Sequence, residues 1–151
     1  MAARTERILI IDPDERARAD LDRYLVSRGF YVHGYADIGS ARSLFDDQPP
    51  DLIFADLPPE AINDLTTRLS LEGSFIPLVA YSDVTTASEV ISALRAGAAD
   101  FVLKPCTEMG SLEDVLGRLF DRVRVNRLNQ LYRRELEEAN NDLREGISEL
   151  R

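Results

Sequence analysis

Four polar residues follow short apolar runs, where their side chains could act together. They are Asp12 after ILII, Asp56 after LIFA, Ser82 after LVAY and Lys104 after FVL. Taken singly, each is as easily explained as a helix cap or a solvated side chain. Together, two carboxylates, a hydroxyl and an ammonium form the set that phosphoryl transfer to an aspartate requires, with one carboxylate as nucleophile and the other groups around the phosphoryl oxygens.

Carboxylates that crowd one edge of a sheet repel each other unless a cation lies between them. Oxygen ligands at this density suit Mg²⁺, which binds one or two carboxylates and keeps several waters. The sequence therefore predicts a Mg²⁺ site near Asp12 and Asp56, with Lys104 as a further positive charge for a phosphoryl oxygen.

The apolar runs alternate with helix-length stretches along the chain. The runs are continuous rather than alternating, which is typical of strands covered on both faces, and they span residues 8–11, 30–32, 52–55, 76–81 and 101–103. The first helix is expected over residues 15–27, and helices with apolar faces follow each later strand. This order predicts an α/β fold, a parallel five-stranded sheet with helices on both faces. In such sheets the chemistry lies beyond the carboxyl ends of the strands.

The sequence after Ser111 is helical without a stop. Its first part has apolar residues at helical spacing and should pack on the sheet. Further on, a seven-residue repeat is formed by Leu136, Leu143 and Leu150, with Tyr132 and Ala139 at the complementary spacing. We expect a domain over residues 1–124 and an extended helix over residues 125–151, which either pairs with a second copy as a coiled coil or stays single and solvated. The helix would lead to an output domain outside this chain.

Composition excludes several classes of protein. The 151 residues are 44% hydrophobic and carry a net charge of -9, which argues against a disordered chain and against a nucleic-acid-binding one. A single cysteine excludes an internal disulfide. No apolar run approaches the roughly 20 residues of a membrane span. We expect a cytoplasmic protein with no membrane partner.

The segments ILIID, DLIFAD, IPLVAYS and AGAADFVLKP, in this order and at these spacings, resemble the receiver domain of two-component response regulators. The resemblance runs from residue 7 to residue 119. It implies a doubly wound, flavodoxin-like fold of strand order 2-1-3-4-5 with five helices, the last one extended. It also implies a signalling domain, which at most catalyses its own phosphorylation and dephosphorylation, and a sensor histidine kinase or phosphotransfer protein as partner.

The same resemblance assigns roles to the residues of the site. Asp56 would accept the phosphoryl group, and Lys104 would contact it. Asp12, Asp56 and the backbone carbonyl of Pro58 would bind Mg²⁺.

Two further residues would be the moving parts of the switch. Ser82 would supply a hydroxyl that is drawn to the phosphoryl group, and Phe101 an aromatic ring whose rotamer changes. The peptide bond between Lys104 and Pro105 would be cis.

One departure from the family pattern concerns the metal. Pro13 stands where receivers have a second acid that binds Mg²⁺ directly, and Asp14 lies one step further, an uncertain ligand. Weaker Mg²⁺ binding is therefore expected. This leaves open a pseudo-receiver that acts as a binding or dimerisation module without phosphorylation. An enzyme of the haloacid-dehalogenase type, with Asp12 as nucleophile, also shows a DxD signature, but its later acidic pair is missing here.

Overall fold

The computed structural model describes residues 6–83, 86–104 and 109–149. All five strands form one parallel sheet in the order β2-β1-β3-β4-β5, as predicted. The strands are β1 (Arg7–Ile11), β2 (Tyr31–Tyr35), β3 (Leu52–Ala55), β4 (Leu78–Ser82) and β5 (Asp100–Leu103).

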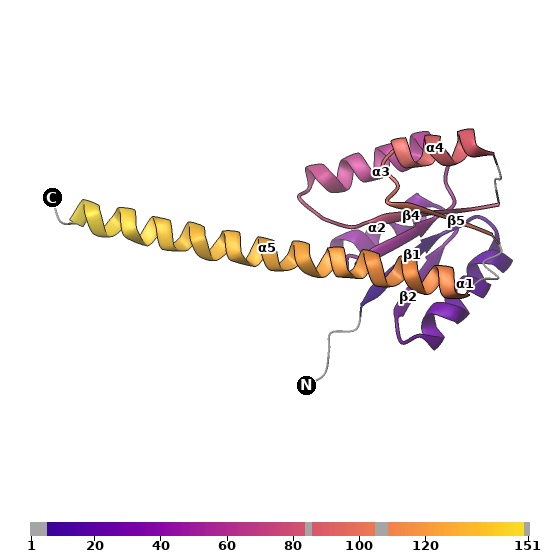
Figure 1. Cartoon of the computed structure of the whole chain (residues 1–151), viewed down its shortest axis with the longest axis horizontal. Coiled ribbons are helices and arrows are strands. Elements are labelled where there is room, and N and C mark those ends of the chain that lie inside the picture. Colours follow the sequence, from indigo (N-terminus) through magenta and orange to yellow (C-terminus); the bar gives the residue numbers. More distant parts are fainter. Residues whose placement is uncertain (1–5, 84–85, 105–108, 150–151) are drawn as a thin grey trace.

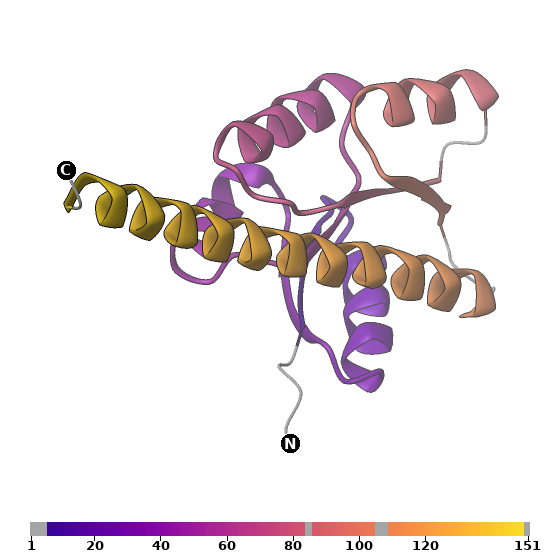
Figure 2. The same ribbon diagram turned by 60° about the vertical axis from the view of Figure 1, so that its left-hand side comes forward.

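Helices cover both faces of this sheet. Two of them, α1 (Glu15–Ser27) and α5 (Met109–Glu149), lie on one face. The other face is covered by α2 (Ile38–Asp47), α3 (Pro59–Leu71) and α4 (Ala87–Arg95), and both views show this separation (Figure 1, Figure 2). The predicted doubly wound α/β fold is confirmed.

Two hydrophobic cores explain why the strand sequences are apolar without interruption. Successive residues of a strand point to opposite faces, so Ile8 and Ile10 pack with α1 and α5, whereas Leu9 and Ile11 pack with α2, α3 and α4. All four side chains are at most 1% exposed. Burial on both sides fixes the sheet, and with it the positions of the loops at the strand ends.

Two strands differ from the predicted ranges by more than one residue at an end. The edge strand β2 continues to Tyr35, beyond the expected 30–32. The predicted range ended too early because the later residues of this strand are only half-buried or exposed and carry no apolar signal. Strand β4 begins at Leu78 rather than at residue 76, since Pro77 has no amide hydrogen to join the ladder.

The helix α5 has two different parts. Up to Val123 it buries one face against the sheet, and after that it projects from the domain (Figure 1). Ion pairs fix the point of departure, since Arg124 pairs with Glu6 at 3.0 Å and Arg127 with Asp51. Within the described residues, no helix has the length and apolar character that crossing a membrane requires.

Candidate functional site

The site lies at the carboxyl ends of β1, β3 and β5, where backbone hydrogen bonds fix the first residue after each strand. The amide of Asp12 donates to Tyr35 O at 2.9 Å, and that of Asp56 to Ile11 O at 2.8 Å. The amide of Lys104 donates to Ser82 O at 2.9 Å. Each side chain therefore starts from a backbone held by a neighbouring strand.

The Lys104 ammonium lies between the two carboxylates. Its Nζ is 2.6 Å from Asp12 Oδ2 and donates a hydrogen bond to Asp56 Oδ2 at 2.6 Å. The lysine reaches them from the outer strand β5 by passing over Tyr81, whose ring centroid is 5.5 Å from Nζ. One ammonium thus holds together residues from the ends of two neighbouring strands.

Burial and charge act in opposite directions on this lysine. Its side chain is only 9% exposed, and that of Asp12 only 1%. Burial acts to lower the pKa of Lys104, but the hydrogen bonds and negative charges of Asp12 and Asp56 outweigh it, so the pKa is raised above its ordinary value of 10.5. At neutral pH the site holds a protonated lysine.

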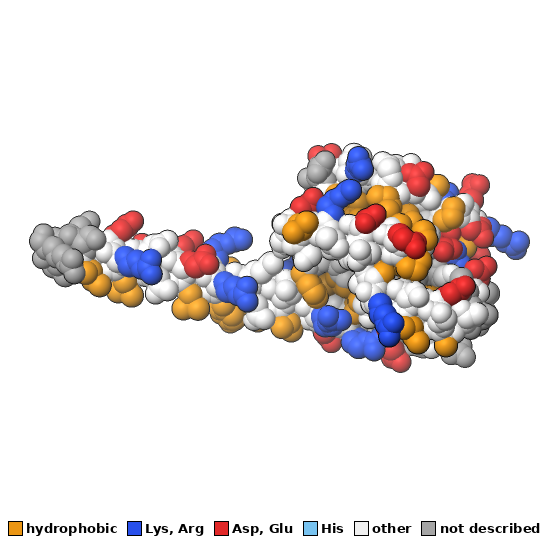
Figure 3. Space-filling view, turned by 90° about the horizontal axis from the view of Figure 1, so that it is seen from above, with side chains coloured by type: hydrophobic (Ala, Val, Ile, Leu, Met, Phe, Trp, Pro, Cys, Tyr) orange, Lys and Arg blue, Asp and Glu red, His pale blue; other side chains and the backbone are white. Residues whose placement is uncertain are grey.

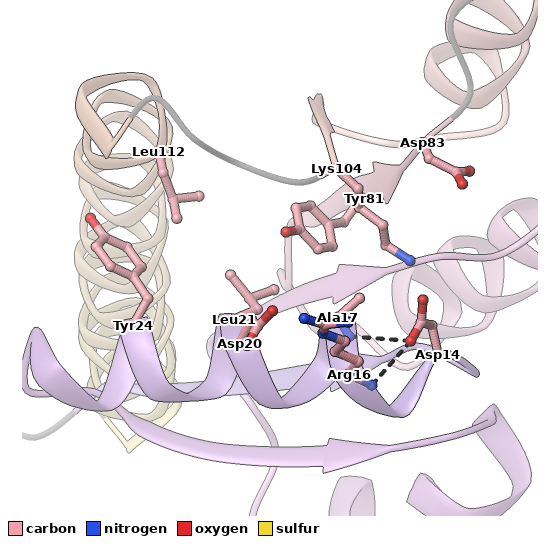
Figure 4. Close-up of a pocket in the computed structure, with 10 residues that line it drawn as sticks. All are labelled: Asp14, Arg16, Ala17, Asp20, Leu21, Tyr24, Tyr81, Asp83, Lys104 and Leu112. Atoms are coloured by element: carbon pink, nitrogen blue, oxygen red, sulfur yellow. Dashed lines mark hydrogen bonds between the residues drawn. The ribbon is translucent and has the colours of Figure 1, made fainter.

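Asp14, the uncertain ligand, is placed as a helix cap. Its Oδ1 accepts the backbone amides of Arg16 at 3.0 Å and Ala17 at 3.3 Å, and Figure 4 shows these bonds at the start of α1. Its own amide donates to Asp12 Oδ1 at 2.9 Å. As the residue before α1, Asp14 uses its carboxylate to satisfy free N–H groups of the first helical turn.

The oxygens of Asp12, Asp56 and Pro58 are of the kind that a small hard cation such as Mg²⁺ prefers. Asp12 Oδ2 and Asp56 Oδ2 both lie 2.6 Å from Lys104 Nζ, so the two carboxylates are near enough to each other to serve as ligands of one Mg²⁺. The Pro58 carbonyl already accepts the Ile62 amide at 3.1 Å, which leaves it one lone pair. Among the described residues, no cluster of three or more acidic, histidine or cysteine side chains has the arrangement of a metal site. The structure thus offers Mg²⁺ a pair of carboxylates.

The two residues expected to move lie in the neighbouring strands β4 and β5. Ser82 is the last residue of β4 and is half-buried. Phe101 lies in β5 opposite Ala80 of β4 and packs, partly buried, on the core under α3 and α4. Pro105, and with it the expected cis peptide bond, lies outside the described residues.

Other contributors to the site were not predicted. Arg18 of α1 donates to the Asp12 carbonyl at 2.7 Å, and Tyr81 lies beside the lysine (Figure 4). One sequence signal could have strengthened the case for Lys104, because it is the single lysine among 18 basic residues. A chain that otherwise uses arginine keeps a compact ammonium where two carboxylates converge.

A pocket of about 520 Å³ opens beside the lysine, between α1 and α5. Asp14 and Arg16 line it at the start of α1, Asp83 follows β4, and Tyr24 and Leu112 form its far end. The pocket gives a reagent from solution a path to the Lys104 end of the site.

The comparisons with known proteins all identify the same family. Residues 8–116 match the response regulator receiver domain. The chain is 32% identical to regulatory protein AtoC of Escherichia coli (strain K12) over 104 residues, which are 66% of this chain and 22% of AtoC. It is 30% identical to response regulator MprA of Mycobacterium sp. (strain KMS) over 115 residues, which are 75% of this chain and 48% of MprA.

A solved structure shows the same fold. A two-component response regulator from Clostridium difficile has a TM-score of 0.68 at 19% identity, over 78% of this chain and 98% of that one. The chain spans less than half the length of AtoC and of MprA.

Proposed function

The chain belongs to the response-regulator receiver domain family, and we propose that it is a phosphorylation switch that accepts a phosphoryl group on Asp56 from a sensor histidine kinase or a phosphotransfer protein. The observation that supports this most is the Lys104 ammonium held at 2.6 Å from both Asp56 and Asp12. An acceptor needs a cation at hand for the incoming phosphoryl oxygens, and this one is buried and in place. The proposed exchange would take place in the cytoplasm.

The proposed transfer uses the two oxygens of Asp56 differently. Lys104 is bonded to Oδ2, which leaves Oδ1 for attack on the phosphorus. The new O–P bond forms as the P–N bond of the donor phosphohistidine breaks, and the imidazole leaves with the electron pair and takes a proton from solvent. Lys104 then passes from Oδ2 to an oxygen of the bound phosphoryl group.

Mg²⁺ would be held by Asp12 and Asp56, with the Pro58 carbonyl as a third ligand. When bound, it would neutralise the phosphoryl oxygens during transfer. Asp14 supplies no charge to the metal while it caps α1.

The switch itself is proposed to lie in β4 and β5. The Ser82 hydroxyl would be drawn to the phosphoryl group, and the space it vacates would admit the half-buried Phe101 ring. Such a movement changes the surface around α4, β5 and α5, and α5 would carry it to an output domain or to a second copy of the chain.

The alternative proposal is a pseudo-receiver. Asp14 caps α1 rather than facing the site, which leaves two carboxylates there for a metal, and Lys104 pairs with both of them. In that case the domain would act by binding alone.

Restoring the missing acid is expected to tighten Mg²⁺ binding. The Pro13→Asp substitution adds a third carboxylate next to Asp12, and we expect about a tenfold lower dissociation constant for Mg²⁺, or about 1.4 kcal/mol. A Mg²⁺ titration followed by NMR measures it. Ala19→Asp, on the exposed side of α1, adds the same charge away from the site and should change the constant less than twofold. Equal effects of the two substitutions would refute a direct ligand position at residue 13.

The proposal is tested with beryllofluoride, a phosphoryl mimic, in the presence of Mg²⁺. Because Lys104 is the single lysine, lysine labelled with ¹⁵N gives one backbone amide and one ammonium signal, both in the site. Both signals should shift in the wild-type chain and stay unchanged in Asp56→Asn. Unchanged wild-type signals at millimolar Mg²⁺ would instead favour the pseudo-receiver.

A further inference from the structure

The projecting part of α5 has one apolar face that the domain does not cover. The apolar residues of this face follow one another at repeating intervals of three, four and four positions. Figure 3 shows hydrophobic side chains along this edge of the projecting helix. We call these residues the α5 seam: Val125, Leu128, Tyr132, Leu136, Ala139, Leu143 and Ile147. Its six larger side chains are between 48% and 65% exposed. Seven residues at this spacing form a continuous apolar stripe, which is typical of a helix that packs on a partner rather than of a single solvated helix.

The period of the seam is eleven residues rather than seven. The seven-residue repeat expected from the sequence describes only part of it, and its next position would be Gly146. An eleven-residue period, with roughly 3.67 residues per turn, includes Val125, Leu128 and Ile147 and omits the glycine. Helices that pair through this period wind around each other weakly and with a right-handed twist.

The helix face that carries the α5 seam changes from charged to apolar at the point where α5 leaves the domain. Continued toward the N-terminus, it passes through Asp121, Arg118 and Asp114, which are all exposed and charged. The buried residues of this earlier part, such as Phe120 and Val123, lie on the other side of the helix. The line of the α5 seam is thus apolar only where the helix has left the domain. If a second copy of the helix packed on the seam, the domain of each copy would lie on the side of its helix that faces away from the partner.

Charges beside the seam indicate which partner fits. About a quarter turn to one side lie Arg133 and Arg144, and about a quarter turn to the other lie Glu135 and Asp142. In a parallel pair of identical helices, the basic side of one faces the acidic side of the other. In an antiparallel pair, basic side would face basic side and acidic side would face acidic side, which is unfavourable.

We propose that the chain forms a homodimer through the α5 seam, as a parallel, in-register, two-stranded coiled coil with an eleven-residue repeat. The inference rests on the proposed role of α5 as the element that carries the signal onward.

Sedimentation equilibrium of the unphosphorylated chain tests the association. The wild type should have twice the chain mass of 17.0 kDa, and Leu136→Glu/Leu143→Glu should have the mass of one chain. Gln130→Glu/Asn141→Glu adds the same charges on the exposed opposite side of α5 and should remain a dimer. A monomeric wild type, or the same mass for both variants, would overturn the proposal.

Disulfide trapping tests the orientation. In a Cys106→Ser background, Leu143→Cys should oxidise to a covalent dimer, because parallel, in-register helices bring the two thiols together across the seam. Asn141→Cys, on the opposite side, is the matched control and should stay monomeric in a denaturing gel. A sedimenting dimer whose residue 143 thiols do not cross-link would rule out the parallel register. Both tests should be repeated in Asp56→Asn, which cannot be phosphorylated. Pairing through the α5 seam needs no phosphoryl group, so this variant should give the same mass and the same cross-link. The dimer is thereby tested separately from the proposed phosphorylation of Asp56.

Discussion

Replacing Lys104 with methionine is expected to lower the free energy of unfolding at neutral pH by about 3 kcal/mol, because it leaves two converging carboxylates without their cation. Methionine keeps the long apolar stem that passes over Tyr81, so the loss reports the charge. Denaturant unfolding at a fixed protein concentration, followed by circular dichroism, measures it.

The pH dependence should also change in the variant. In the wild type the raised pKa of Lys104 means that its contribution is complete at neutral pH and is lost only as the pH rises through the folded-state pKa, above 10.5. In Lys104→Met this alkaline loss of stability should be absent, because the variant has no ammonium to deprotonate. Millimolar Mg²⁺ should restore part of the loss, because the metal takes the place of the ammonium. A variant as stable as the wild type at pH 7, with or without Mg²⁺, would contradict this interpretation of the site.

The second large effect is expected at the other end of the sheet. Asp51 is 3% exposed, accepts the Arg7 amide at 2.8 Å and pairs with Arg127 of α5. Asp51→Ala removes both contacts and leaves a partly buried N–H group without its acceptor, so we expect a loss of about 2 kcal/mol in the free energy of unfolding. Asp121→Ala makes the same substitution at an exposed carboxylate of α5 and should cost less than about 0.5 kcal/mol.

A double-mutant cycle with Arg127→Met isolates the ion pair. If Asp51 holds α5 at the point where it leaves the domain, the two losses should not add, and the coupling should be about 1 kcal/mol. Additive losses would show that Asp51 stabilises the domain independently of Arg127.

The sheet could be predicted from the sequence because its strands are buried on both faces. Residues 52–55 of β3 are all apolar, and the strand occupies the predicted range. The edge strand β2 gave a shorter prediction, because Gly34 carries no hydrophobic signal and Tyr35 is only partly covered. Local pattern thus predicts the central strands better than the edge.

The site was less predictable than the fold. Strand ends converge in any parallel sheet, so the nearness of Asp12, Asp56 and Lys104 could be expected from topology. Asp14 precedes the predicted start of the first helix, so its role as the cap of α1 could have been predicted from the sequence. The hydrogen bond from Arg18 to the Asp12 carbonyl depends on side-chain packing and does not follow from the spacing of the residues.

The most direct test of the proposed function is to identify the residue that acetyl phosphate modifies in the presence of Mg²⁺. Borohydride reduction converts an aspartyl phosphate to homoserine and so marks the site permanently. Cleavage after arginine then separates Asp12, in residues 8–16, from Asp56, in residues 43–68, so mass spectrometry can tell them apart. We expect one modification, in the peptide with Asp56, that is absent from Asp56→Asn. An unmodified chain at millimolar Mg²⁺, or a mark in the peptide with Asp12, would contradict the proposal that Asp56 accepts the phosphoryl group.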